Sequence, residues 1–151
     1  MKRGFRKGFT LIELLIVLAV IAALLAVVTP IALNAVRRAN LTKIASNLRN
    51  IKSAAETYIT MNPTAEATTN LLGVLENGYL TTNPNGNEED PAKYKYSAEL
   101  TEDASKNITV TIEYLGGDAS VEDLQKIYSE VINVGTKDAP IPGVKFEIKS
   151  W

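Results

Sequence analysis

The chain has 151 residues, 46% of them hydrophobic, and it contains neither Cys nor His. Disulfides and thiolate metal sites are therefore excluded, and the usual general base and commonest metal ligand are missing, which disfavours most enzyme chemistry. The formal net charge of −1 includes four cations within the first eight residues, so the rest of the chain is more acidic than the total suggests. An acidic body of this kind is a poor generic binder of nucleic acids.

The first element is a basic segment, residues 1–8, followed by a long apolar run. From Leu14 to Leu33 only one Thr and one Pro interrupt the apolar residues. A helix of this length spans about 30 Å, the thickness of a bilayer core. The basic flank predicts that the N-terminus stays in the cytoplasm. An ordinary secretory signal cleaved after a small residue is the alternative that the composition leaves open.

Glu13 is the only charged residue between Lys7 and Arg37. A carboxylate among apolar residues in a membrane needs a partner. Cleavage after Gly8 would create a positively charged amine on Phe9, and Glu13 could pair with it within one helix or between neighbouring subunits. The alternative is that the Glu13 side chain reaches the cytoplasmic interface by itself.

The segment KGFTLIEL, residues 7–14, resembles the prepilin peptidase site of type IV pilins and type II secretion pseudopilins. The resemblance implies cleavage between Gly8 and Phe9, N-methylation of Phe9, and a role for Glu13 and Phe9 in subunit assembly. It also implies the pilin fold and a homo-oligomeric helical filament. The implied partners are a prepilin peptidase, an inner-membrane assembly platform and a cytoplasmic assembly ATPase acting in trans.

Pro30 lies inside the expected helix, where it removes the hydrogen bond to the carbonyl of Ala26. An ordinary kink in a membrane helix is one interpretation. The resemblance implies another, in which Ala22–Pro30 is helical in the membrane and partly extended in the filament.

Beyond Pro30 the helix becomes amphipathic and is expected to end before Pro63, which gives about 78 Å of nearly continuous helix from Thr10 to Met61. The apolar stripe that should pack on a sheet comprises Leu41, Ile44, Leu48, Ile51, Ala55 and Tyr58. A basic cluster, Arg37, Arg38 and Lys43, would mark the outer membrane interface or pair with acidic patches on adjacent subunits. DNA contact is possible but not supported.

The next segment, Thr69–Gly78, predicts a short helix, and a turn-rich acidic loop follows it. Glu88, Glu89 and Asp90 in this loop could hold Ca²⁺, but they lack the alternating spacing of a calcium loop, so a solvated turn is expected. We expect no other cofactor or metal.

Three strands are predicted, Lys93–Leu100, Ile108–Tyr114 and Val144–Ser150, with alternate residues facing inward. The Lys/Tyr alternation of the first fits a sheet with packed Tyr and solvated Lys better than a nucleic-acid strip. Ser120 and Asp123 have capping-box spacing and predict a helix from Val121 to about Ile132. The fold class is therefore α+β, with a long N-terminal helix packed on a small, mainly antiparallel sheet.

The expected organisation is a cleaved leader (1–8), a transmembrane and filament-core helix (9–33), the amphipathic half of the helix (34–62) and a globular region (63–151). The main functional hypothesis is a structural subunit of a type IV pilus-like filament. The precursor would be a single-pass protein of the cytoplasmic membrane, and the filament would be extracellular or periplasmic. Alternatives are a type II secretion pseudopilin, a DNA-uptake pilus subunit and, from another class, a membrane-anchored binding or sensory module.

Overall fold

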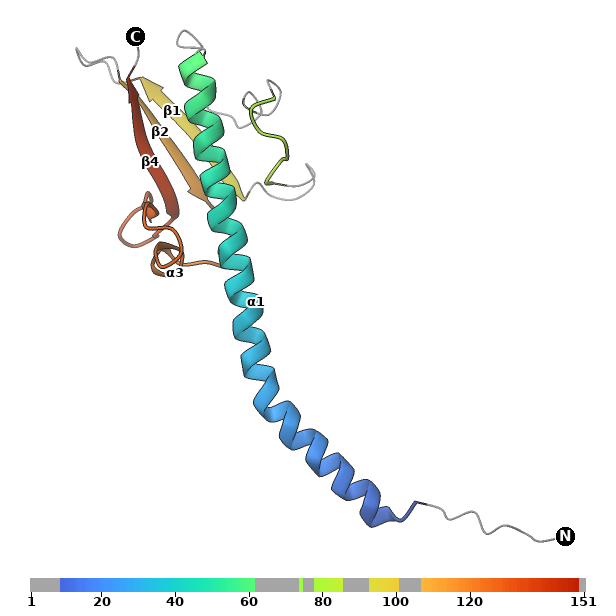
Figure 1. Ribbon diagram of the computed structural model, residues 1–151. Helices are drawn as coiled ribbons and strands as arrows, with labels where there is room; N and C mark the ends of the chain where they lie inside the picture. The colour runs from blue at the N-terminus through green and yellow to red at the C-terminus, as the bar shows by residue number, and fades with distance from the viewer. Residues whose placement is uncertain (1–8, 62–73, 75–77, 86–92, 101–106, 150–151) are drawn as a thin grey trace, which may run out of the picture. The chain divides into compact units, whose positions relative to one another are not determined.

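The computed structural model describes residues 9–61, 74, 78–85, 93–100 and 107–149. Its elements are α1 (Leu11–Met61), β1 (Tyr94–Leu100), β2 (Asn107–Tyr114), α3 (Val121–Gln125), β3 (Ile132–Asn133) and β4 (Pro142–Lys149) (Figure 1). The chain divides into two compact units, residues 1–39 and 40–151, and α1 contributes to both. The expected leader and acidic loop lie outside the described residues, as does most of the expected helix Thr69–Gly78. Within that helix only Val74 is described as helical, and it is buried.

The first unit consists of the N-terminal part of α1, and all of its described side chains are exposed. The second unit begins with the remainder of α1, which carries a buried stripe. The six residues of the predicted stripe are buried, and three further residues join them, Ala45, Ala54 and Ile59. Since Lys43 and Arg49 remain exposed, this half of the helix is amphipathic as predicted.

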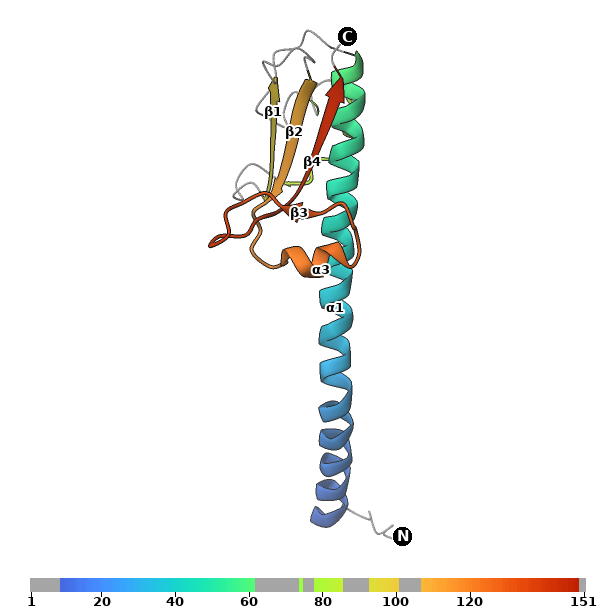
Figure 2. The same ribbon diagram turned by 90° about the vertical axis from the view of Figure 1, so that its left-hand side faces the viewer.

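A four-stranded antiparallel sheet in the order β1-β2-β4-β3 packs against this stripe (Figure 2). In β2 the buried side chains are those predicted to face inward, namely Ile108, Val110, Ile112 and Tyr114. In β1 the buried residues are Tyr94, Tyr96 and Ala98, whereas Lys95 and, just before the strand, Lys93 are exposed. The two faces of the sheet therefore follow the alternation in the sequence, and the α+β class is confirmed.

The helix predicted from Val121 to about Ile132 is wrong in its length. Its start is confirmed, because Ser120 adopts an extended backbone conformation and its Oγ accepts a hydrogen bond from the Asp123 amide at 3.2 Å. α3 nevertheless ends at Gln125, and turns follow until Ile132 and Asn133 form the unpredicted strand β3.

Asn133 holds the chain beyond β3 in a loop. Its Oδ1 accepts hydrogen bonds from the amides of Gly135 and Ile141, both at 3.0 Å, and its Nδ2 donates to the carbonyl of Thr136 at 3.2 Å. A helix continuing through Ile132 would lose these bonds together with the pairing between β3 and β4. Val131, which the predicted helix included, is buried from a segment that is not helical.

Gly143 precedes the predicted strand Val144–Ser150 but lies inside β4, where it pairs with Glu113 of β2 and Ile132 of β3. A Cβ atom at this position would lie 2.3 Å from the carbonyl oxygen of Ile112. The absence of a side chain therefore permits the close backbone approach, which explains why β4 begins two residues earlier than predicted.

The segment after α3 is held on α1 by contacts that we call the Glu130 cluster, formed by Arg49, Lys52, Tyr128 and Glu130. Lys52 Nζ lies 2.5 Å from Glu130 Oε2, which also accepts a hydrogen bond from the Tyr128 hydroxyl at 2.8 Å. Arg49 lies over the Tyr128 ring, 4.5 Å from its centroid, and donates to the carbonyl of Ile127 at 3.1 Å. These contacts fix a segment that has no disulfide available to it.

Candidate functional site

The described chain opens with Phe9 and Thr10, and α1 begins at Leu11. The side chain of Glu13 reaches back to the residue before the helix, where its Oε2 accepts hydrogen bonds from the Thr10 amide at 2.8 Å and the Thr10 hydroxyl at 2.7 Å. The Glu13 amide in turn donates to Thr10 Oγ1 at 3.4 Å. Thr10 and Glu13 thus form a reciprocal capping box, which satisfies backbone donors that the first turn of a helix leaves without partners.

The sequence contains the signal for this cap, since Thr10 and Glu13 have the S/T-x-x-E spacing. The same spacing rule correctly placed Ser120 at the start of α3. Glu13, by contrast, was interpreted only as a charge that needs a charged partner. Thr10 is therefore the site residue that the sequence analysis missed.

The structure places Phe9 directly before the capping box, with 86% of its surface exposed. In the intact chain the Phe9 nitrogen belongs to a peptide bond, so the positively charged amine expected to pair with Glu13 does not exist. Gly8 lies outside the described residues. Cleavage at Gly8 and Phe9, methylation of Phe9 and the pairing of Phe9 with Glu13 therefore stay predictions.

Behind the capping box, α1 exposes apolar side chains on all sides. Large hydrophobic residues from Leu11 to Val36 are exposed, with fractions between 47% for Ile21 and 77% for Leu11. This part of α1 is long and apolar enough to cross a membrane, judged by length and composition. A continuous apolar surface of this size is unusual for a soluble monomer and indicates an apolar environment or partner. It fits membrane anchoring of a precursor.

Pro30 lies within α1 and the helix continues through it. One residue earlier, the Thr29 hydroxyl donates to the carbonyl of Leu25 at 2.7 Å. This bond satisfies the Thr29 hydroxyl inside the helix itself, which suits a polar group in apolar surroundings. The expected loosening of Ala22–Pro30 concerns the assembled filament and not the single chain, so it stays a prediction.

Within the described part of the chain, no three acidic side chains come together in a way that could hold a metal ion. Glu88, Glu89 and Asp90, the candidate Ca²⁺ residues, lie outside the described residues.

These observations define a class of structure. An apolar helix segment begins with a capped carboxylate and is joined in sequence to an α+β unit. Comparison with protein families adds that residues 3–29 match the prokaryotic N-terminal methylation motif, so the chain carries this motif. Neither the curated proteins nor the solved structures contain a match to the chain. The motif supports a type IV pilin-like or pseudopilin protein and indicates a structural subunit rather than an enzyme.

Proposed function

We propose that the protein is a structural subunit of a type IV pilus-like filament, processed by a prepilin peptidase and polymerised through the apolar part of α1. The observation that carries the proposal is a carboxylate, Glu13, held at the start of an otherwise uncharged and fully exposed apolar helix segment. The N-terminal methylation motif over residues 3–29 supports it.

The geometry of Glu13 leaves room for a second partner. A carboxylate has two oxygens and accepts several hydrogen bonds. In the described residues the capping box engages Oε2 through both Thr10 donors. After cleavage at Gly8, the positively charged amine of Phe9 would donate a hydrogen bond that Oε1 accepts. Glu13 can therefore keep its cap while it pairs with the Phe9 amine of its own chain or of a neighbouring subunit.

The apolar surface of α1 suits both a bilayer and the core of a filament. Lipid chains are as apolar as leucine side chains, so moving Leu11–Val36 from lipid to a bundle of like helices gains little hydrophobic free energy. The direction and register in which neighbouring α1 helices pack must then come from the few polar groups on the helix. Glu13 is the only charged one among the described residues before Arg37, which makes its pairing with Phe9 the natural determinant of assembly.

The remaining parts of the assembly apparatus act in trans. We propose that the precursor sits in the cytoplasmic membrane with its N-terminus inside, where it meets the peptidase, an assembly platform and a cytoplasmic ATPase. The assembled filament is extracellular or periplasmic. A type II secretion pseudopilus, a DNA-uptake pilus and a membrane-anchored sensory module are the competing functions.

Glu13→Gln separates the charge of Glu13 from its capping role. Glutamine also serves in a capping box, so the helix start and membrane insertion should persist, but an uncharged amide cannot pair with an amine as a carboxylate does. We expect the yield of sheared filament to fall roughly tenfold or more. This is the effect of weakening the Glu13–Phe9 pairing by about 1.4 kcal/mol, because that free energy corresponds to a factor of ten in an equilibrium constant. Filament at the wild-type yield would contradict the proposal.

Two controls accompany this experiment. Glu122→Gln removes a carboxylate in α3 and should leave filament yield unchanged. The intact mass and N-terminal sequence of the exported protein should begin at methylated Phe9, whereas a start at Met1 would reject processing. Electron microscopy of the sheared material then distinguishes a long pilus from a short pseudopilus, and a sensory module would give no filament at all.

A further inference from the structure

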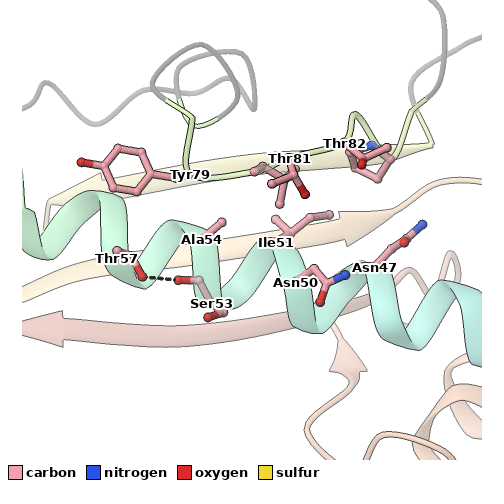
Figure 3. A pocket seen from close by; sticks show the side chains of 11 residues that line it. Asn47, Asn50, Ile51, Ser53, Ala54, Thr57, Tyr79, Thr81 and Thr82 are labelled. Atoms are coloured by element: carbon pink, nitrogen blue, oxygen red, sulfur yellow. Dashed lines mark hydrogen bonds between the residues drawn. The ribbon is translucent and has the colours of Figure 1, made fainter.

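A groove with a volume of about 380 Å³ opens on the second unit between α1 and the segment Tyr79–Pro84 (Figure 3). One wall comes from Asn47 to Thr57 of α1 and the other from the facing segment. Sites for small molecules measure about 300–1,000 Å³, so the groove lies at the lower end of that range.

The side chains that line the groove are all uncharged. Its polar groups are the amides of Asn47 and Asn50 and the hydroxyls of Ser53, Thr57, Thr81 and Thr82. Amide and hydroxyl side chains both donate and accept hydrogen bonds, although the Thr57 hydroxyl proton and one amide proton of Asn47 are donated within the chain. They match a ligand whose own polar groups also do both, which is the property of alcohols. A phosphate, carboxylate or ammonium group would lose its hydration here without gaining a counter-charge.

The floor of the groove is apolar. Ile51 and Ala54 are 1% and 6% exposed, and the ring of half-buried Tyr79 stands beside them (Figure 3). Tyr79 packs edge-on against Tyr58, with ring centroids 5.4 Å apart and planes at 73°, and its hydroxyl contacts Met61 Sδ at 3.5 Å. The ring is thus held in one orientation, and it offers a flat apolar surface to a ligand.

Both walls are fixed before any ligand arrives. On α1, the Thr57 hydroxyl donates to the carbonyl of Ser53 at 2.8 Å, and Asn47 Nδ2 donates to the Tyr94 hydroxyl at 3.1 Å. Where the facing segment ends, the Asn85 side chain accepts from the Tyr94 amide at 2.7 Å and donates to its carbonyl at 3.1 Å. A preorganised site avoids the entropic cost of ordering its walls on binding.

We propose that this groove binds an uncharged saccharide, with the hydroxyls of the sugar on the polar walls and its C–H face on the ring of Tyr79. A pyranose ring combines a flat apolar face with a rim of groups that donate and accept, as the groove requires. A peptide strand fits less well, since it needs a row of backbone partners, whereas α1 offers only side chains. The proposal does not depend on filament formation.

The test uses the full chain, isotope-labelled, in a detergent without a sugar headgroup. Lactose, maltose, cellobiose and N,N′-diacetylchitobiose are each titrated and the backbone amide signals are followed by NMR. At least one disaccharide should shift the signals of Asn50, Ser53 and Tyr79 in a saturable manner. No saturable shift with any of the four would overturn the proposal.

Variants locate the site. Asn50→Ala and Ser53→Ala should each weaken binding about two- to tenfold, the effect of losing one hydrogen bond. Ser46→Ala is the matched control, because Ser46 is exposed on the same helix, seven residues before Ser53, and does not line the groove. Equal weakening by Ser46→Ala and Ser53→Ala would place the sugar elsewhere and refute the site.

Two further measurements test whether the occupant is an uncharged sugar. In the first, glucose 6-phosphate should bind more weakly than glucose, and tighter binding of the phosphate would show that the groove is not selective for uncharged sugars. In the second, the backbone amide signals of the groove residues are followed as the protein concentration is raised without sugar. A shift under these conditions would show that a second copy of the chain occupies the groove, which would overturn the proposal.

Discussion

Residues 11–39 and 40–61 belong to one helix, yet the first stretch buries no side chain and the second buries nine. Between Glu13 and Arg37 the first stretch carries no charge and is apolar on every side, and the second confines its apolar residues to a stripe that meets the sheet. A helix that is apolar all round belongs in a membrane or in a large core. The comparison therefore shows that the protein supplies the packing partner of the second stretch, whereas that of the first comes from its surroundings.

The largest expected effect comes from shortening the same residue type in both stretches. Leu48 is fully buried, whereas Leu24 is 62% exposed. Leu48→Ala should lower the free energy of unfolding of the second unit by about 2–5 kcal/mol, because it removes buried methyl groups and leaves a cavity. Leu24→Ala should leave it unchanged. Denaturant unfolding in micelles, followed by the tyrosine signals of the sheet, measures both, and equal losses would contradict the assignment of the core.

A smaller effect is expected at the second capping box. Ser120→Ala removes the acceptor of the Asp123 amide and should lower the free energy of unfolding by about 1 kcal/mol. Ser120→Asp keeps an acceptor at the same position and should restore most of the loss. If the alanine and aspartate variants are equally unstable, the cap is not what holds the start of α3. The measured value also estimates the free energy that the Thr10–Glu13 cap contributes, because that cap has the same form at the start of α1.

The smallest effect is a pH dependence of the second unit. The hydrogen bond from Lys52, followed by that from Tyr128, lowers the pKa of Glu130 below its ordinary value. A lowered folded-state pKa gives stability that is fully present above the ordinary Glu pKa of about 4.3 and is lost as the pH falls through the folded value. Because Glu130 is half exposed, the contribution is modest.

Glu130→Gln should flatten this acid part of the stability curve and change little at neutral pH beyond the loss of the ion pair. Thermal unfolding of the wild type and the variant across the acid range measures the difference. A variant that keeps the wild-type slope would show that other carboxylates are responsible.

The sequence predicted those parts of the fold that depend on local periodicity. The stripe through Leu48 and the alternation through Val110 each reveal a buried face without knowledge of its partner. β3 could not be predicted in this way, because it depends on the long-range pairing of Ile132 with Gly143 and on the three hydrogen bonds of Asn133. A two-residue strand has no periodicity to detect.

At the candidate site, the sequence identified Glu13 as exceptional because a lone charge in an apolar run is conspicuous. It did not identify Thr10, although the spacing of Thr10 and Glu13 is that of a capping box, because Glu13 was interpreted only as a charge in need of a charged partner. The groove beside Tyr79 was equally hidden, since α1 and the segment Tyr79–Pro84 each look ordinary alone.

The hydrogen bonds of Asn133 have a practical consequence. The Asn133 side chain closes the loop at Gly135, Thr136 and Ile141, and residues 137–140 beyond these contacts are exposed. The closure is thus separate from the tip, so a short epitope tag inserted after Lys137 should be displayed without disturbing β3 or β4. The loop offers a labelling position by which single subunits could be followed along the proposed filament.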